Sequence, residues 1–185
     1  YGEAGTIKLW ELKTGKELRT FIGHRDKVNS VAITPDGKYI VSSGNWDGTI
    51  RLWEVSSGKE LRIFSEHMGR VDSVVLTPDG KYIVNTDDST IKLWEISSGK
   101  LLQIFEGHSK IINSIAITPD GKYIVSGSLD NRIKIWEISS GKEIQSFNWF
   151  PNNWPQYIIV TVAITPDGKY IISGGNDNTI NLMEI

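Results

Sequence analysis

The chain has 185 residues, a net charge of −2 and no cysteine, and 39% of its residues are hydrophobic. This length and composition predict a folded chain with a buried core, and the lack of cysteine excludes disulfide bonds and thiolate metal sites. Lysine residues recur along the chain without clustering, and no apolar run approaches the ~20 residues of a transmembrane helix, so we expect no nucleic-acid partner, no membrane partner and a cytoplasmic location.

The predicted elements, in chain order, are short strands separated by turns. Within residues 28–64, β-branched apolar runs are separated by Pro-Asp-Gly and Ser-Ser-Gly turns, and no stretch has helical periodicity. We expect two strands in residues 6–21, four strands in each of three segments, and three strands in the last. Those four segments are 28–64, 71–105, 112–147 and 158–184. The total is seventeen strands, which we expect to form a single domain over residues 1–185.

Two sequence markers repeat along the chain with one period. The string TPDGKY begins at Thr34, Thr77, Thr118 and Thr165, at intervals of 43, 41 and 47 residues. The string I-[KR]-[LI]-W-E places tryptophan at positions 10, 53, 94 and 136, at intervals of 43, 41 and 42. A period of this length with four strands per unit predicts an all-β propeller of four-stranded antiparallel blades.

The repeat resembles the WD-repeat family, whose unit runs from a Gly-His pair to a Trp-Asp pair. Gly23-His24 and Gly107-His108 match the opening pair, Glu66-His67 keeps only the histidine, and every closing pair reads Trp-Glu. The resemblance covers the chain from about residue 5 to residue 184. The close similarity of the copies to one another resembles bacterial members of the family.

The resemblance also implies a buried hydrogen-bond chain of His, Ser or Thr, Asp and Trp within each blade. Carried over by position, the complete set is His108, Ser126, Asp130 and Trp136, and the preceding blades supply His24, Ser42, Asp47 and Trp53, then His67, Asp88 and Trp94. The last blade retains Ser173 and Asp177 but has Met183 in place of the tryptophan. Such a chain would pair polar groups that are otherwise buried without partners.

Nothing in this pattern predicts chemistry. The three histidines lie in different blades, and no second histidine or paired carboxylate joins any of them at the spacing of metal ligands. Asp87-Asp88 and Asp177 lack the alternating acidic spacing of a calcium loop. We therefore expect no catalytic residue, no metal and no cofactor.

A closed ring of this family usually has about seven blades, which is more than these strands supply. A missing neighbour would expose a large apolar face. We expect an incomplete ring that is closed by self-association or by the rest of a larger propeller.

One loop departs from the repeat. The segment between Phe147 and Thr165 is five residues longer than its counterparts and is rich in aromatic residues, and Trp46 lies outside the repeat pattern in another loop. Aromatic residues on loops are typical of binding surfaces. The candidate partner-binding residues are Trp46, Trp149, Phe150, Trp154 and Tyr157, although the long loop could instead pack into the gap left by the absent histidine and by Met183.

The resemblance and the lack of reactive residues favour a non-catalytic scaffold that binds protein partners. Two alternatives stay open at this point. One is a propeller-type hydrolase, which would need acids or histidines that converge on the central channel. The other is a protein that binds a glycan or small ligand through its aromatic rim.

Overall fold

The computed structural model describes residues 5–65, 70–148 and 158–184, and these residues form strands and turns without any helix. Seventeen strands are present in the described residues, paired antiparallel in five sheets. The prediction of an all-β chain with seventeen strands is confirmed.

The strands follow the repeat. The first sheet contains β1 (Thr6–Trp10) and β2 (Glu17–Ile22). The second contains β3 (Val28–Ile33), β4 (Tyr39–Gly44), β5 (Ile50–Glu54) and β6 (Glu60–Phe64). The third contains β7 (Val74–Leu76), β8 (Tyr82–Asp87), β9 (Thr90–Glu95) and β10 (Leu101–Phe105). The fourth contains β11 (Ile112–Ile117), β12 (Tyr123–Ser128), β13 (Arg132–Glu137) and β14 (Glu143–Asn148). The last contains β15 (Ile159–Ile164), β16 (Tyr170–Gly175) and β17 (Ile180–Glu184).

The repeated TPDG turn joins the first two strands of each of the last four sheets. In its first copy, the Thr34 hydroxyl donates to the Asp36 carboxylate at 2.6 Å and accepts from the Tyr39 N–H at 3.0 Å. Gly37 closes the turn at φ +70°, a conformation that glycine adopts without steric cost. The hydrogen bonds from Thr34 and from the Lys38 N–H lower the pKa of Asp36 below its usual value. The sequence of this turn therefore fixes the hairpin by itself.

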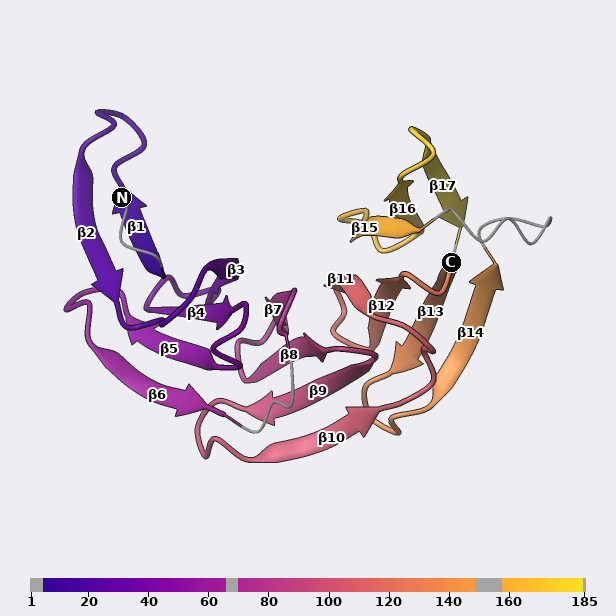
Figure 1. The fold of residues 1–185 in the computed structure, drawn as a ribbon, viewed down its shortest axis with the longest axis horizontal. Coiled ribbons are helices and arrows are strands. Elements are labelled where there is room, and N and C mark those ends of the chain that lie inside the picture. The colour runs from indigo at the N-terminus through magenta and orange to yellow at the C-terminus, as the bar shows by residue number, and fades with distance from the viewer. Residues whose placement is uncertain (1–4, 66–69, 149–157, 185) are drawn as a thin grey trace.

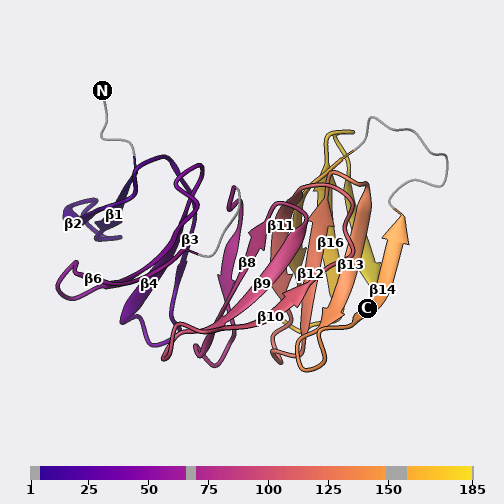
Figure 2. The same cartoon turned by 60° about the horizontal axis from the view of Figure 1, so that its bottom comes forward.

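The five sheets stand one after another around an arc (Figure 1). Strands β3, β7, β11 and β15 lie on the inner side, and β2, β6, β10 and β14 lie on the outer side. The turned view shows the successive sheets stacked side by side along the arc (Figure 2). The first and last sheets do not meet, so the described blades do not close a ring. That residues 1–185 form a single domain stays a prediction.

The hydrophobic core lies between the blades. Phe64 of β6 packs edge-on against Trp94 of the next sheet, with ring centroids 5.6 Å apart, and both side chains are buried. Phe21 with Trp53, at 6.0 Å, and Phe105 with Trp136, at 6.1 Å, repeat the contact. Edge-to-face pairs at such distances stabilise beyond the area that they bury. The outer strands β2, β6 and β10 are therefore packed against the tryptophan of the following blade.

Asparagine side chains join the inner strands of neighbouring blades. The Asn29 side chain on β3 donates to the Val71 carbonyl at 3.1 Å, and Asn113 on β11 donates to the Ile159 carbonyl at 2.8 Å. The third blade has Asp72 at the equivalent position, and an ionised carboxylate has no N–H to donate. One carboxylate oxygen of Asp72 is buried and has no hydrogen-bond partner among the residues that the structure describes.

Candidate binding surface and its buried support

The predicted hydrogen-bond chain is present in the second sheet. The Trp53 indole N–H donates to the Ser42 hydroxyl oxygen at 2.8 Å. Because the indole only donates, the Ser42 hydroxyl donates in turn to His24 Nε2 at 2.7 Å. His24 Nδ1 then donates to the Asp47 carboxylate at 2.7 Å. The four side chains thus join two strands, β4 and β5, to the two loops that carry His24 and Asp47, and each side chain donates to the next.

The directions in which the pKa values of His24 and Asp47 shift agree with a neutral His24 imidazole. Burial lowers the pKa of His24 below its usual value, although the Asp47 carboxylate opposes this shift. Burial would raise the pKa of Asp47, but hydrogen bonds from His24 and from the backbone N–H groups of Arg25 and Thr49 hold it below its usual value. A neutral imidazole can accept from Ser42 while it donates to Asp47. The polar side-chain groups of His24, Ser42, Asp47 and Trp53 are therefore all paired.

The fourth sheet repeats this geometry. Trp136 donates to Ser126 at 2.8 Å, and His108 lies 2.7 Å from the Ser126 hydroxyl and 2.8 Å from the Asp130 carboxylate. The hydrogen bond from His108 helps to lower the pKa of Asp130 against the effect of burial. The structure thus brings together all four residues that the resemblance assigned to this blade.

The third sheet departs from the prediction at Asp88. The Trp94 indole donates at 2.8 Å to the side-chain carbonyl of Asn85, which occupies the serine position. The Asp88 side chain is exposed at the tight turn between β8 and β9, at φ +49°, and it takes no part in a buried chain. The turn is shorter than in the other blades, and this difference moves the carboxylate out to solvent. The role assigned to Asp88 was therefore wrong, and His67 lies outside the described residues.

The buried carboxylate of this blade is Asp87, which the sequence did not single out for this role. It pairs with the Lys92 ammonium at 2.7 Å, and both side chains are less than a tenth exposed. In the fourth sheet the equivalent Lys134 pairs at 2.7 Å with Glu143 on the outer strand. The third sheet has Leu101 at the place of that glutamate, so the lysine takes its carboxylate from the other end of the blade.

The last sheet also corrects a prediction. The Ser173 hydroxyl is buried without a hydrogen-bond partner in the described residues, because Met183 offers no indole N–H where the other blades have tryptophan. The Asp177 carboxylate accepts from the Thr179 N–H at 3.1 Å and from the Thr179 hydroxyl at 2.6 Å. Asp177 therefore stabilises its own turn.

Trp46 lies on the loop between β4 and β5, and 71% of its surface is exposed. The loop is held on both sides of the tryptophan. The Asn45 N–H donates to the Lys27 carbonyl at 2.8 Å, and the Asp47 carboxylate accepts from the Arg25 N–H at 3.0 Å. A large aromatic side chain is thus presented to solvent by a loop whose base is part of the buried hydrogen-bond chain.

The other four aromatic candidates, Trp149, Phe150, Trp154 and Tyr157, lie outside the described residues. Among the residues that are described, no group of three or more histidines and carboxylates is placed to hold a metal ion. No helix in that same part of the chain is long and apolar enough to cross a membrane.

Comparison with known proteins agrees with this geometry. The profile of the family described as "WD domain, G-beta repeat" (WD40) matches residues 15–54, 58–95, 99–137 and 144–182. The chain belongs to the WD40 family. Each matched WD40 repeat starts near the outer strand of one blade and ends with the three inner strands of the next.

Curated relatives match single stretches of the WD40 chain. A Lissencephaly-1 homolog of Heterostelium pallidum is 45% identical over 53 residues, which are 24% of this chain and 13% of the relative. A Lissencephaly-1 homolog of Dictyostelium discoideum is 50% identical over 40 residues, 22% of this chain and 10% of the relative. The WD40 repeat-containing protein HOS15 of Arabidopsis thaliana is 51% identical over 35 residues, 19% of this chain and 6% of the relative. The matches thus span about an eighth or less of these relatives' lengths, and they give no support to the expected bacterial character. WD40 membership and these relatives support a role in protein interaction.

Proposed function

We propose that this WD40 chain is a non-catalytic module that binds a protein partner through the loops around Trp46. The observation that carries the proposal is the exposure of Trp46 on a loop that Asp47 ties to His24. Exposed tryptophans held on a rigid support are typical anchors of protein interfaces. The support limits the conformational entropy that the loop would lose on binding.

The binding test uses the 185-residue chain and a displayed library of random 12-residue peptides. Selection on the unmodified chain should enrich peptides whose binding is lost with Trp46→Ala. Trp10→Ala is the matched control, because Trp10 is also exposed, at 53%, but lies on β1 at the end of the arc. Peptides that bind both variants equally, or no enrichment at all, would contradict the proposal.

The same surface in our proposal includes Trp149, Phe150, Trp154 and Tyr157. Replacing Trp149 and Trp154 by alanine tests this part separately. Unchanged thermal unfolding with weaker peptide binding supports a role in the surface, whereas loss of folding shows that the loop packs into the blade. Turnover of hydrolase substrates would favour the hydrolase alternative, and saturable quenching of tryptophan fluorescence by a sugar would favour the glycan alternative.

A second proposal concerns the outer face of the last sheet. Ile180 and Leu182 on β17 are 80% and 61% exposed, whereas the equivalent Ile133 and Ile135 are buried between blades. We propose that another copy of the 185-residue chain covers this face. The measurement is the solution mass at several concentrations: a single 20.7 kDa species throughout would overturn the proposal. Ile180→Glu with Leu182→Glu should abolish any larger species.

A further inference from the structure

Two exposed cationic residues lie on a loop that is hydrogen-bonded to the loop of Trp46. Arg25 and Lys27 belong to the loop between β2 and β3, and both are exposed. Their backbone is hydrogen-bonded to the loop of Trp46 at both of its sides, through the Arg25 N–H to Asp47 and the Asn45 N–H to Lys27. The two loops are therefore joined, and together they present one exposed aromatic side chain and two exposed cationic side chains.

The nearby carboxylates leave these two cations available. Neither the Arg25 nor the Lys27 side chain forms an ion pair with any residue that the structure describes. The Asp47 carboxylate is already used by His24, and the Asp72 carboxylate pairs with Arg70 at 2.6 Å. Asp26 lies between the two cations in the sequence, and its carboxylate accepts from the Lys27 N–H at 2.6 Å.

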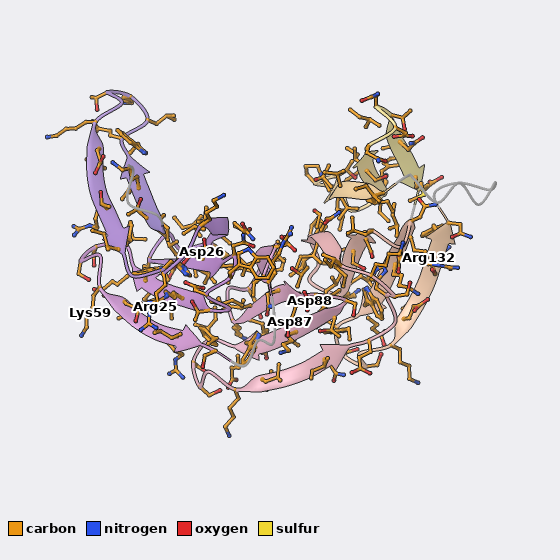
Figure 3. The ribbon with its side chains drawn as sticks, in the orientation of Figure 1. Arg25, Asp26, Lys59, Asp87, Asp88 and Arg132 are labelled. Atoms are coloured by element: carbon orange, nitrogen blue, oxygen red, sulfur yellow. The ribbon has the colours of Figure 1, made fainter. Side chains whose placement is uncertain are left out.

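The sign of the exposed charged side chains changes from one blade to the next along the arc. Figure 3 shows Arg25 and Asp26 over the second sheet, whereas Asp87 and Asp88 lie at the middle of the arc and Arg132 lies on its other side. Asp87 is buried and pairs with Lys92, so the exposed carboxylate of the two is Asp88, which is separated from Arg25 along the arc. The fully exposed charges around Trp46 are those of Arg25 and Lys27, because Asp26 is only partly exposed and the Asp47 side chain is 3% exposed.

From this arrangement we infer that the partner segment is acidic: an apolar side chain that packs on Trp46, with aspartate or glutamate residues on both sides that meet Arg25 and Lys27. The inference rests on the proposed binding function and adds the chemistry of the partner. Complementary charge around an apolar anchor gives specificity and faster association. Single-stranded nucleic acid also pairs cations with aromatic stacking, but the chain has a net charge of −2 and lacks the clustered basic residues that are typical of nucleic-acid binding.

The test reads the composition of the selected peptides. Selection on the unmodified chain should enrich aspartate and glutamate next to an apolar residue. Arg25→Glu with Lys27→Glu should weaken binding of a selected acidic peptide by about tenfold or more, because like charges then face each other. Selection on that variant should enrich lysine and arginine instead.

The matched control is Lys38→Glu with Lys59→Glu, which changes the net charge equally at the opposite end of the same blade. A strand of five residues such as β5 spans about 17 Å, and exposed charges beyond about 8 Å are largely screened at physiological ionic strength. This control should bind the acidic peptide as the unmodified chain does.

The outcomes separate the two proposals. Enriched peptides that depend on Trp46 but show no acidic bias would overturn the inference and leave the binding function standing. Equal loss of binding in both charge variants, or binding of a 12-residue oligothymidylate as tight as that of the acidic peptide, would also overturn it. No enrichment that depends on Trp46 would overturn the binding function itself.

Discussion

The Trp136 indole N–H lies 2.8 Å from the Ser126 hydroxyl oxygen, at the centre of a buried chain that the next blade has lost. The equivalent Ser173 has a buried hydroxyl without a hydrogen-bond partner in the described residues. The same residue type is thus paired in one blade and unpaired in its neighbour, which allows the two positions to be compared directly.

We predict that Ser126→Ala destabilises the chain by about 1–3 kcal/mol, because it leaves the indole N–H of Trp136 and the Nε2 atom of His108 without a buried hydrogen-bond partner. Ser173→Ala should have little effect or a small stabilising one, since it removes a hydroxyl that has no partner. Urea unfolding of both variants measures the free energy of unfolding. Equal destabilisation by the two substitutions would argue against the hydrogen-bond chain as the source of stability.

Asp72→Asn is predicted to stabilise the chain by about 1 kcal/mol, the size of one added hydrogen bond. The new side-chain N–H would meet the Ile112 carbonyl of the next blade, as Asn29 meets the Val71 carbonyl. The pair with Arg70 is partly exposed, and its lost charge should cost less than about 1 kcal/mol. The thermal unfolding midpoint checks this, and a lower midpoint would refute it.

Replacement of Lys92 by methionine should cost more than replacement of Lys134. Each lysine pairs with a carboxylate at 2.7 Å, but the Asp87 side chain is 7% exposed and that of Glu143 is 35% exposed. A carboxylate left buried without its partner costs about 3–5 kcal/mol, whereas Glu143 can be hydrated. Unfolding free energies at neutral pH test the order, and a reversed order would show that Asp87 is stabilised by other groups.

Acid should weaken the fold in two steps. The pKa of His24 is lowered in the folded chain, so the unfolded state binds more protons as the pH falls below about 6.5, and stability decreases from there. Asp47 and Asp130 also have lowered pKa values, so their contribution is complete above about pH 4 and is lost below it. His24→Gln should flatten the change between pH 7 and pH 5 in urea unfolding, and an unchanged slope would contradict the role of His24.

The sequence was sufficient for the architecture because its markers are local. The TPDG turn is closed by its own Thr34 and Asp36, and a tryptophan follows the turn threonine after 19, 17 and 18 residues in the three complete blades. The site was harder to predict where a turn is one residue longer or shorter than in the other blades, because this difference changes which side chain points inward. Asp88 matched the family position by counting, but the short turn after β8 exposes it and buries Asp87. The loss of pairing at Ser173 follows from Met183, which removes a donor from another strand.

The loop surface around Trp46 was predicted only in part. Its tryptophan stands out because it breaks the repeat, but Arg25 and Lys27 resemble ordinary turn residues in the sequence. Their relevance depends on hydrogen bonds between two loops about twenty residues apart, the Asn45 N–H to the Lys27 carbonyl and the Arg25 N–H to the Asp47 carboxylate. Pairing of this kind is set by the fold and not by residue type.

The contact of Phe64 with Trp94 joins the outer strand of one blade to the third strand of the next, and Phe21 with Trp53 does the same one unit earlier. The second and third sheets therefore each carry one half of two such junctions. Duplication or loss of a whole repeat would leave every remaining junction matched, so a gene encoding this chain could change its blade number without any compensating change in the core.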